Sequence, residues 1–158
     1  MDEKIKTEYF KRSYFAVDGL WFMMAEKMFS FDEALMLDKE VWSVLPKIQA
    51  RKIKELLSID GDGILNFKKA LGQRFDMEEY DYEFSLIDDN HIRLFIHKCP
   101  WLEIIKKSGR ESLASKISGV ICPTELDVWA KEFGLIMETD QDKRLCNGCI
   151  NCVWDFHQ

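Results

Sequence analysis

The first segment of the chain places apolar side chains with the period of an α-helix. Between residues 1 and 29, large apolar residues recur at steps of four and three, which is the spacing of one stripe along an amphipathic helix. We expect this stripe to pack in the core rather than to bind a cofactor. Its members are Phe10, Tyr14, Val17, Trp21, Met24 and Met28.

A second helix is predicted to begin near Phe31. Ser30 and Glu33 have the spacing of a capping box, in which the two side chains satisfy backbone donors at a helix start. The helix continues to about Leu57 and contains Pro46, which removes one backbone hydrogen bond and predicts a kink. Its apolar stripe comprises Ala34, Leu37, Val41, Val44, Leu45 and Ile48.

Residues 58–66 match a calcium-binding loop only in its middle. Ser58 and Lys69 stand at the first and twelfth positions, where the ion requires an acidic ligand and a bidentate Glu. We therefore interpret the segment as a turn that caps a helix over residues 64–75.

From residue 80 onward the period changes to two. Residues 80–86 and 91–98 alternate apolar and polar side chains around a polar turn, which predicts a β-hairpin. Short helices are expected from Pro100 to about residue 107 and from Cys122-Pro123 to Gly134, because Pro is favoured in a first helical turn. Two more strands are expected over residues 135–139 and 150–156.

This order of elements predicts an α+β fold, with N-terminal helices packed on a mainly antiparallel sheet that carries short inserted helices. The 158 residues fit a single domain, with a mainly helical half at 1–79 and a hairpin and Cys-rich half at 80–158. Nothing in the pattern excludes a homodimer.

The charge balance argues against nucleic acid as a partner. With 22 basic and 28 acidic residues, the formal net charge is −6, which repels a phosphate backbone. We interpret the one basic cluster as a solvated helix face. The longest uncharged apolar run, residues 20–25, is too short to cross a bilayer, and no signal-type segment is apparent, so we expect a cytoplasmic protein without membrane contact. The basic cluster consists of Lys47, Arg51, Lys52 and Lys54.

Three of the five cysteines form a C-x2-C-x2-C run at Cys146, Cys149 and Cys152. In a chain without an export signal, this spacing indicates metal or thiol chemistry rather than disulfides. It suits a [4Fe-4S] cluster, which we favour, or a tetrahedral zinc site. Either Cys99 or Cys122, each of which precedes a proline, is a candidate for the fourth ligand. The alternative is that these cysteines are reduced thiols that fill space.

Cys99 and Cys122 are both expected at helix starts, where the helix dipole lowers a thiol pKa and favours metal ligation or nucleophilic attack. His97 lies two residues before Cys99, so a strand would place both side chains on one face. The pair could act as catalytic base and nucleophile or as two ligands. A structural Cys beside a hydrogen-bonded His is the simpler alternative.

The terminal strand is expected to point Cys152, Trp154 and Phe156 toward one face, and Asp155 and His157 toward the other. If the first face is the core, Cys152 belongs to the interior. Asp155 is then either a solvated carboxylate or a group that orients a ligand or a backbone amide.

Three short motifs resemble the L-2-amino-thiazoline-4-carboxylic acid hydrolase-like family: residues 97–100 (His-Lys-Cys-Pro), residues 119–122 and the ending at residues 152–156. The resemblance covers about residues 80–156. It implies ring opening by addition of water without a redox cofactor, carried by Cys99, Cys122 and Cys152. More loosely, the layout resembles 4-vinyl reductase-type small-molecule-binding domains. Cys146 and Cys149 are additional to the family pattern, which makes a metal-binding relative plausible.

Three functions therefore compete. The first is a metal-binding or redox module with a small-molecule pocket lined by aromatic residues of the N-terminal helices. The second is a hydrolase that attacks a small C=N or amide substrate through a Cys thiolate or a metal-bound water. The third is an interaction protein without chemistry.

Overall fold

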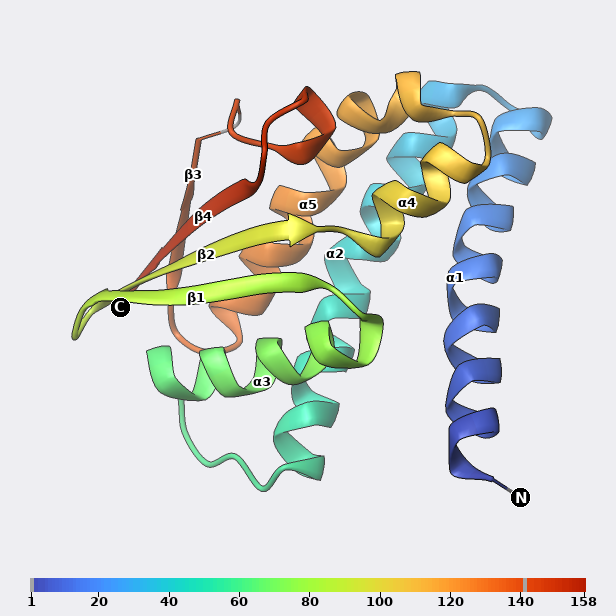
Figure 1. Cartoon of the computed structure of the whole chain (residues 1–158). Helices are drawn as coiled ribbons and strands as arrows, with labels where there is room; N and C mark the ends of the chain where they lie inside the picture. The colour runs from blue at the N-terminus through green and yellow to red at the C-terminus, as the bar shows by residue number, and fades with distance from the viewer. Residues whose placement is uncertain (1, 141) are drawn as a thin grey trace. The chain divides into compact units, whose positions relative to one another are not determined.

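The computed structural model describes residues 2–140 and 142–158 (Figure 1). The chain forms two compact units, one within the first 40 residues and one from Val41 to Gln158. The prediction of a single domain stays a prediction.

The first unit contains α1 (Glu3–Met28) and the beginning of α2 (Phe31–Leu56). The carboxylate of Asp2 caps α1 by accepting a hydrogen bond from the backbone N–H of Lys4 at 2.9 Å. The predicted start of α2 is confirmed: the N–H of Glu33 donates to Ser30 Oγ at 3.2 Å, and that hydroxyl donates to the Glu33 carboxylate at 2.7 Å.

The prediction that the α1 stripe packs in the core is wrong. Phe10 is 61% exposed and Trp21 is 69% exposed, and Val17, Met24 and Met28 are exposed as well. Periodicity indicates that a helix has an apolar face, but it does not indicate what covers that face.

The predicted core stripe of α2 is also wrong. Leu37, Val41, Val44 and Ile48 are exposed, although Ala34 is buried. The buried face of α2 in the second unit lies beside the predicted one, because large aromatic and small residues there fill the space next to the sheet layer. It is formed by Trp42, Pro46, Ala50 and Ile53.

The second unit adds α3 (Ile64–Glu78), β1 (Asp81–Asp88), β2 (His91–Lys98), α4 (Pro100–Lys107), α5 (Ala114–Lys131), β3 (Ile136–Thr139) and β4 (Cys152–His157). The strands form one sheet in the order β1-β2-β4-β3, and every neighbouring pair is antiparallel. The predicted hairpin and both later strands are confirmed. Two short 3₁₀ turns, at Glu111–Leu113 and Leu145–Asn147, complete the unit.

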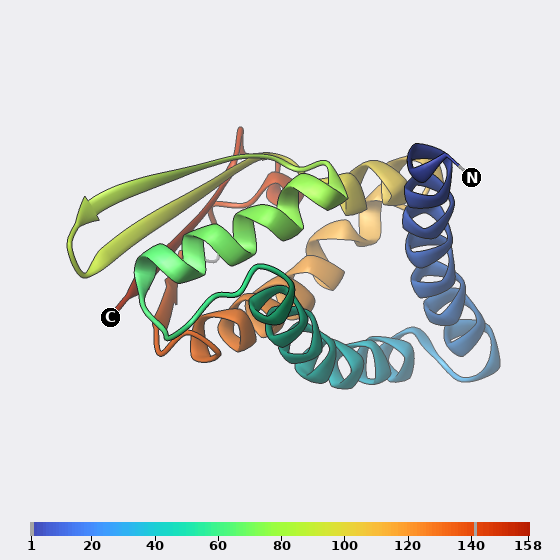
Figure 2. The same cartoon turned by 90° about the horizontal axis from the view of Figure 1, so that it is seen from below.

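Helices α3 and α5, with the end of α2, cover one face of the sheet (Figures 1 and 2). Their apolar side chains meet those of β2 and β4 in one core, where Phe67 of α3 lies 4.6 Å from Phe156 of β4 between ring centroids. Trp154 and Phe156 point into this core as predicted, and both are almost fully buried. The α+β class is therefore confirmed.

The predicted helix start at Cys122 is wrong. Helix α5 begins at Ala114 and runs through both Cys122 and Pro123. Pro123 has no N–H to donate to the carbonyl of Gly119, so the helix carries a proline in its interior rather than in its first turn. Cys122 therefore lacks the helix-dipole environment that its position before a proline suggested.

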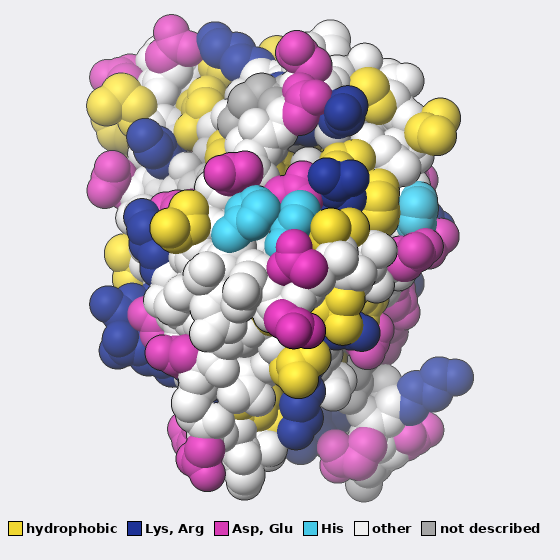
Figure 3. Space-filling model, turned by 90° about the vertical axis from the view of Figure 1, so that its left-hand side faces the viewer, with side chains coloured by type: hydrophobic (Ala, Val, Ile, Leu, Met, Phe, Trp, Pro, Cys, Tyr) yellow, Lys and Arg dark blue, Asp and Glu magenta, His cyan; other side chains and the backbone are white. Residues whose placement is uncertain are grey.

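The other face of the sheet carries charged side chains rather than a helical layer. Asp155 accepts hydrogen bonds from the His91 ring and, at 2.9 Å, from Arg93 Nε on the neighbouring strand. The ring of His157 lies 4.1 Å from that of His91, and its Nε2 is 3.4 Å from the Glu138 carboxylate. Figure 3 shows two adjacent histidines bordered by acidic side chains. Asp155 thus orients cross-strand partners.

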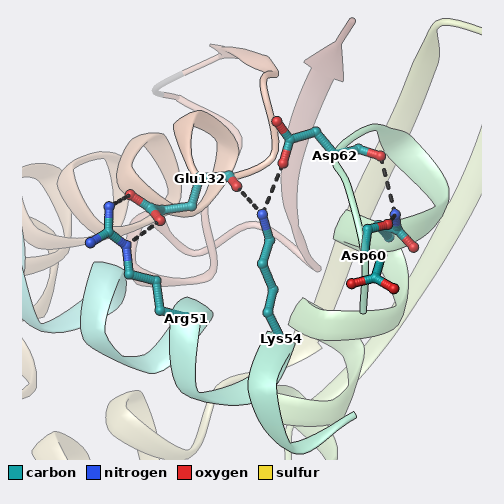
Figure 4. A network of polar contacts seen from close by, with 6 residues as sticks. Arg51, Lys54, Asp60, Asp62 and Glu132 are labelled. Carbon is teal, nitrogen blue, oxygen red and sulfur yellow. Dashed lines mark hydrogen bonds and ion pairs between the residues drawn. The ribbon is translucent and has the colours of Figure 1, made fainter. Parts of the chain in front are cut away.

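The basic cluster on α2 is neutralised by neighbouring carboxylates (Figure 4). Arg51 pairs with Glu132 at 2.8 Å, and Lys54 Nζ contacts Asp62 at 2.9 Å and the Glu132 carbonyl at 2.6 Å. Asn66 ties the turn before α3 together by donating to the carbonyl of Asp60. These pairs support the interpretation of a solvated helix face. Among the described residues, no helix has the length and apolarity needed to span a bilayer.

Candidate metal centre

The cysteine-rich loop lies between β3 and β4 and is held by its own backbone. The N–H of Cys149 donates to the carbonyl of Arg144 at 3.2 Å, and the N–H of Leu145 donates to the sulfur of Cys152 at 3.3 Å. Gly148 has a φ of 83°, a left-handed conformation that favours glycine. The loop therefore wraps around the Cys152 thiol, as the position of Gly148 in the motif suggested.

Two polar contacts dock this loop on α5, one turn before Cys122. The guanidinium of Arg144 is buried and donates to Ser118 Oγ at 3.2 Å, and the Ser115 hydroxyl donates to the Asn147 side-chain oxygen at 2.6 Å. A Cβ on residue 119 would lie 3.1 Å from Arg144 Nη1, so glycine at that position permits the close approach. These anchors bring the loop to the segment of α5 that carries Cys122.

Cys99 reaches the same region from the sheet. It is the N-cap residue of α4, directly after β2, and it packs against the core. Because β2 and β4 are antiparallel and Ile96 pairs with Cys152, the end of β2 and the start of β4 lie at one end of the sheet. Cys99, Cys122 and Cys152 therefore all border the core at this end.

The thiols of Cys99, Cys122, Cys146 and Cys152 lie within electrostatic reach of one another. Burial raises the pKa of Cys99 to about 12, and the charges of Cys146 and Cys152 add to the rise. Burial likewise raises the Cys122 pKa well above its usual value, with contributions from Glu125 and the other three thiols. Burial, with a contribution from Cys146, raises the pKa of Cys152 to about 11. Free of metal, these groups are neutral thiols.

Cys149 differs from these four. It is exposed, and its sulfur lies 3.3 Å from the carbonyl of Asp142 within the same loop. All five cysteines are free of disulfide bonds. Within residues 2–140 and 142–158, no three His, Cys, Asp or Glu side chains already stand in the arrangement that holds an ion. The four inner thiols are neighbours rather than a preformed ligand set.

The predicted pairing of His97 with Cys99 is not what the described contacts show. His97 Nε2 lies 3.9 Å from the Glu83 carboxylate, and its ring stacks on Phe95, whereas Cys99 packs against the core. The strand ends at Lys98, so the side-chain alternation that placed the two on one face does not extend to Cys99.

A buried ionic cluster beside the thiols was missed from the sequence. Arg74 of α3 donates to Glu78 at 3.0 Å and to Glu125 of α5 at 3.3 Å. Burial alone would lower the Arg74 pKa, but the two carboxylates outweigh it and raise the pKa. Tyr80 joins this region, because burial, Cys99 and Glu125 raise its pKa well above the usual value. The available signal was the apolar spacing of Phe67 and Leu71, which continues into Arg74 and Glu78.

A surface depression opens between α3 and β1, next to Tyr80. None of the cysteines lines it, and neither do the aromatic residues of the N-terminal helices that the sequence suggested. Its lining combines charged and aromatic side chains: Lys68, Asp76, Tyr80, Asp81, Tyr82 and Phe84.

Sequence comparison places the chain in a class whose role is open. Residues 3–158 match the model described as "Family of unknown function (DUF6125)", and the chain belongs to that family. No curated protein and no solved structure matches it.

Proposed function

We propose that this chain is a cysteine-ligated metal-binding protein, with a [4Fe-4S] cluster favoured over zinc. The ligands are Cys99, Cys122, Cys146 and Cys152. The observation that carries the proposal is the mutual influence of these four thiols on one another's pKa values at one end of the core.

The chemistry of the donors supports metal binding. Neutral thiols must lose their protons to ligate, and four thiolates so close together repel one another unless a cation lies between them. Binding therefore releases protons, and the metal removes the cost of bringing four thiolates together. Both zinc and an iron–sulfur cluster accept four thiolates.

The choice of an iron–sulfur cluster rests on the C-x2-C-x2-C motif, which is typical of such clusters. In this assignment Cys149 is a spectator, because its exposed side chain turns to the Asp142 carbonyl while Cys146 and Cys152 lie near the remote thiols. The loop needs only side-chain rotation and a small inward movement, because Arg144 and Asn147 already dock it on α5.

A small-molecule ligand is part of the same proposal. The depression next to Tyr80 supports it, since Tyr80 lies within electrostatic reach of Cys99. Its mixed charged and aromatic lining suits a small polar molecule with an apolar ring or chain.

The described contacts give no support to a thiolate nucleophile. The raised pKa values keep Cys99 and Cys122 protonated near neutral pH, and His97 faces Glu83. A hydrolase would therefore depend on a metal-bound water, which four thiolate ligands leave no position for.

The test is anaerobic purification followed by measurement of iron, acid-labile sulfide and zinc. About four irons and four sulfides per chain, with a broad absorption band near about 400 nm, are expected for the cluster. One zinc per colourless chain would support the ligand set and overturn the choice of metal. Protein that binds neither after reconstitution with iron and sulfide, or with zinc, would overturn the proposal.

A further inference from the structure

Helix α1 carries an apolar seam that the rest of the described chain leaves open. The seam residues at positions 10, 17, 21, 24 and 28 are 45–73% exposed. Their steps of seven and of four and three residues follow the a and d positions of a heptad repeat, in which two helices pack side by side. A helix of 26 residues is about 39 Å long, which is enough for almost three heptads of such packing.

We propose that a second copy of this chain covers the α1 seam, with the two α1 helices packed antiparallel around a two-fold axis. Such an interface is self-complementary, because the same surface contributes from both copies.

The exposed area is sufficient for a stable dimer. Residues 5–29 include four aromatic side chains that are 61–69% exposed, and at about 150–250 Å² each when fully accessible they offer about 400–650 Å². Six exposed aliphatic or Met side chains lie in the same stretch. Together they approach the roughly 800 Å² that each partner buries in a standard interface. These ten residues are Ile5, Tyr9, Phe10, Val17, Leu20, Trp21, Met23, Met24, Met28 and Phe29.

The charges along α1 favour the antiparallel orientation. Residues 3–15 carry four basic and two acidic side chains, a net +2, whereas residues 16–28 carry two acidic and one basic side chain, a net −1. Antiparallel packing places the basic half of one copy beside the acidic half of the other, and parallel packing would place like beside like.

A membrane surface is a less suitable occupant. Interfacial helices are usually rich in Lys and Arg on the polar face, and anionic lipids attract that face. Here the basic side chains Lys11 and Arg12 pair with Glu8 at 2.8 and 2.6 Å, and the whole chain has a net charge of −6. The polar face therefore offers little attraction for an anionic bilayer.

The test compares Trp21→Glu with Leu65→Glu by sedimentation velocity over a dilution series. The two side chains are 69% and 70% exposed, so the same charge is introduced at equal accessibility, on the seam and away from it on α3. We expect the wild type and Leu65→Glu to sediment as dimers, and Trp21→Glu to weaken dimerisation at least about thirtyfold, as expected for a Trp at an interface centre.

Three results would overturn the proposal. One is a wild type that stays monomeric at high micromolar concentration, and another is a Trp21→Glu dimer as tight as that of Leu65→Glu. The third is a monomer that co-sediments with vesicles of phosphatidylserine and phosphatidylcholine through the seam. Unfolding of Trp21→Glu is checked by circular dichroism, and Met28→Glu, at an end of the same seam, is the second variant if it unfolds. Metal content should be equal in all variants, so the result is separate from the metal proposal.

Discussion

Replacement of Arg74 by Met is expected to destabilise the second unit severely. The Arg74 side chain is 2% exposed and bridges two carboxylates that are 9% exposed, Glu78 and Glu125. It also lies among the rings of Trp42 and Trp129, at about 6 Å from their centroids. Methionine keeps much of the packing volume but leaves two buried carboxylates without a cation.

The expected loss is about 3–5 kcal/mol in the free energy of unfolding, which is typical for removing one partner from a buried ionic group. This is a large share of the roughly 5–15 kcal/mol that stabilises a domain. Urea denaturation followed by circular dichroism measures it. The loss should shrink between about pH 7 and about pH 5, because protonation of the buried carboxyls removes their unpaired charge.

Two further variants separate the charge effect from a packing effect. Lys131→Met removes an exposed ion pair with Asp127 on α5, and it should cost less than about 1 kcal/mol. A triple variant with Arg74→Met, Glu78→Leu and Glu125→Leu should recover most of the stability, since an apolar replacement of a whole buried cluster is often neutral. A loss below about 1 kcal/mol in Arg74→Met, or no recovery in the triple variant, would refute the reasoning.

Three other predictions concern the loop, the thiols and the outer sheet face. Arg144→Met should lower metal affinity at least about tenfold while Lys143→Met does not, because only Arg144 docks the loop on Ser118; a zinc titration of both variants decides this, and equal affinities would contradict the docking role. Mass-spectrometric mapping of iodoacetamide labelling at about pH 8 on metal-free protein should find Cys149 modified first and Cys99 and Cys122 last, since burial raises the pKa of the latter two; rapid labelling of Cys122 would contradict their burial. Partial burial alone would raise the Asp155 pKa, but hydrogen bonds from Arg93 and His91 lower it, so the Tm advantage over Asp155→Asn should be present above about pH 4 and vanish as pH falls through the lowered pKa; an advantage that grows with acid would contradict this sign.

Local patterns predicted the elements well, because each depends on neighbours in the sequence. The capping box at Ser30 and the alternation before and after the turn at residues 88–90 were sufficient to place α2 and the hairpin. Cys122-Pro123 failed because surrounding helix-forming residues and tertiary packing carry α5 through the proline.

The burial of the helices could not be predicted in the same way. The stripes of Trp21 on α1 and Val41 on α2 look like core stripes, yet both lie exposed, since period alone does not distinguish a core from a surface that awaits a partner. For the candidate site, the loop spacing indicated Cys146 and Cys152, and the prolines drew attention to Cys99 and Cys122. Only the antiparallel pairing of β2 with β4 and the docking of Arg144 show why all four thiols are neighbours.

The most direct test of the central claim is a parallel measurement of bound metal in Cys122→Ser and Cys149→Ser, both purified and reconstituted without oxygen. The two changes are chemically identical, but one removes a buried thiol of the proposed ligand set and the other an exposed thiol outside it. We predict that Cys122→Ser loses most of its metal and that Cys149→Ser retains the wild-type content. Loss of metal in Cys149→Ser with normal content in Cys122→Ser would contradict the assignment and show that the terminal loop holds the metal by itself.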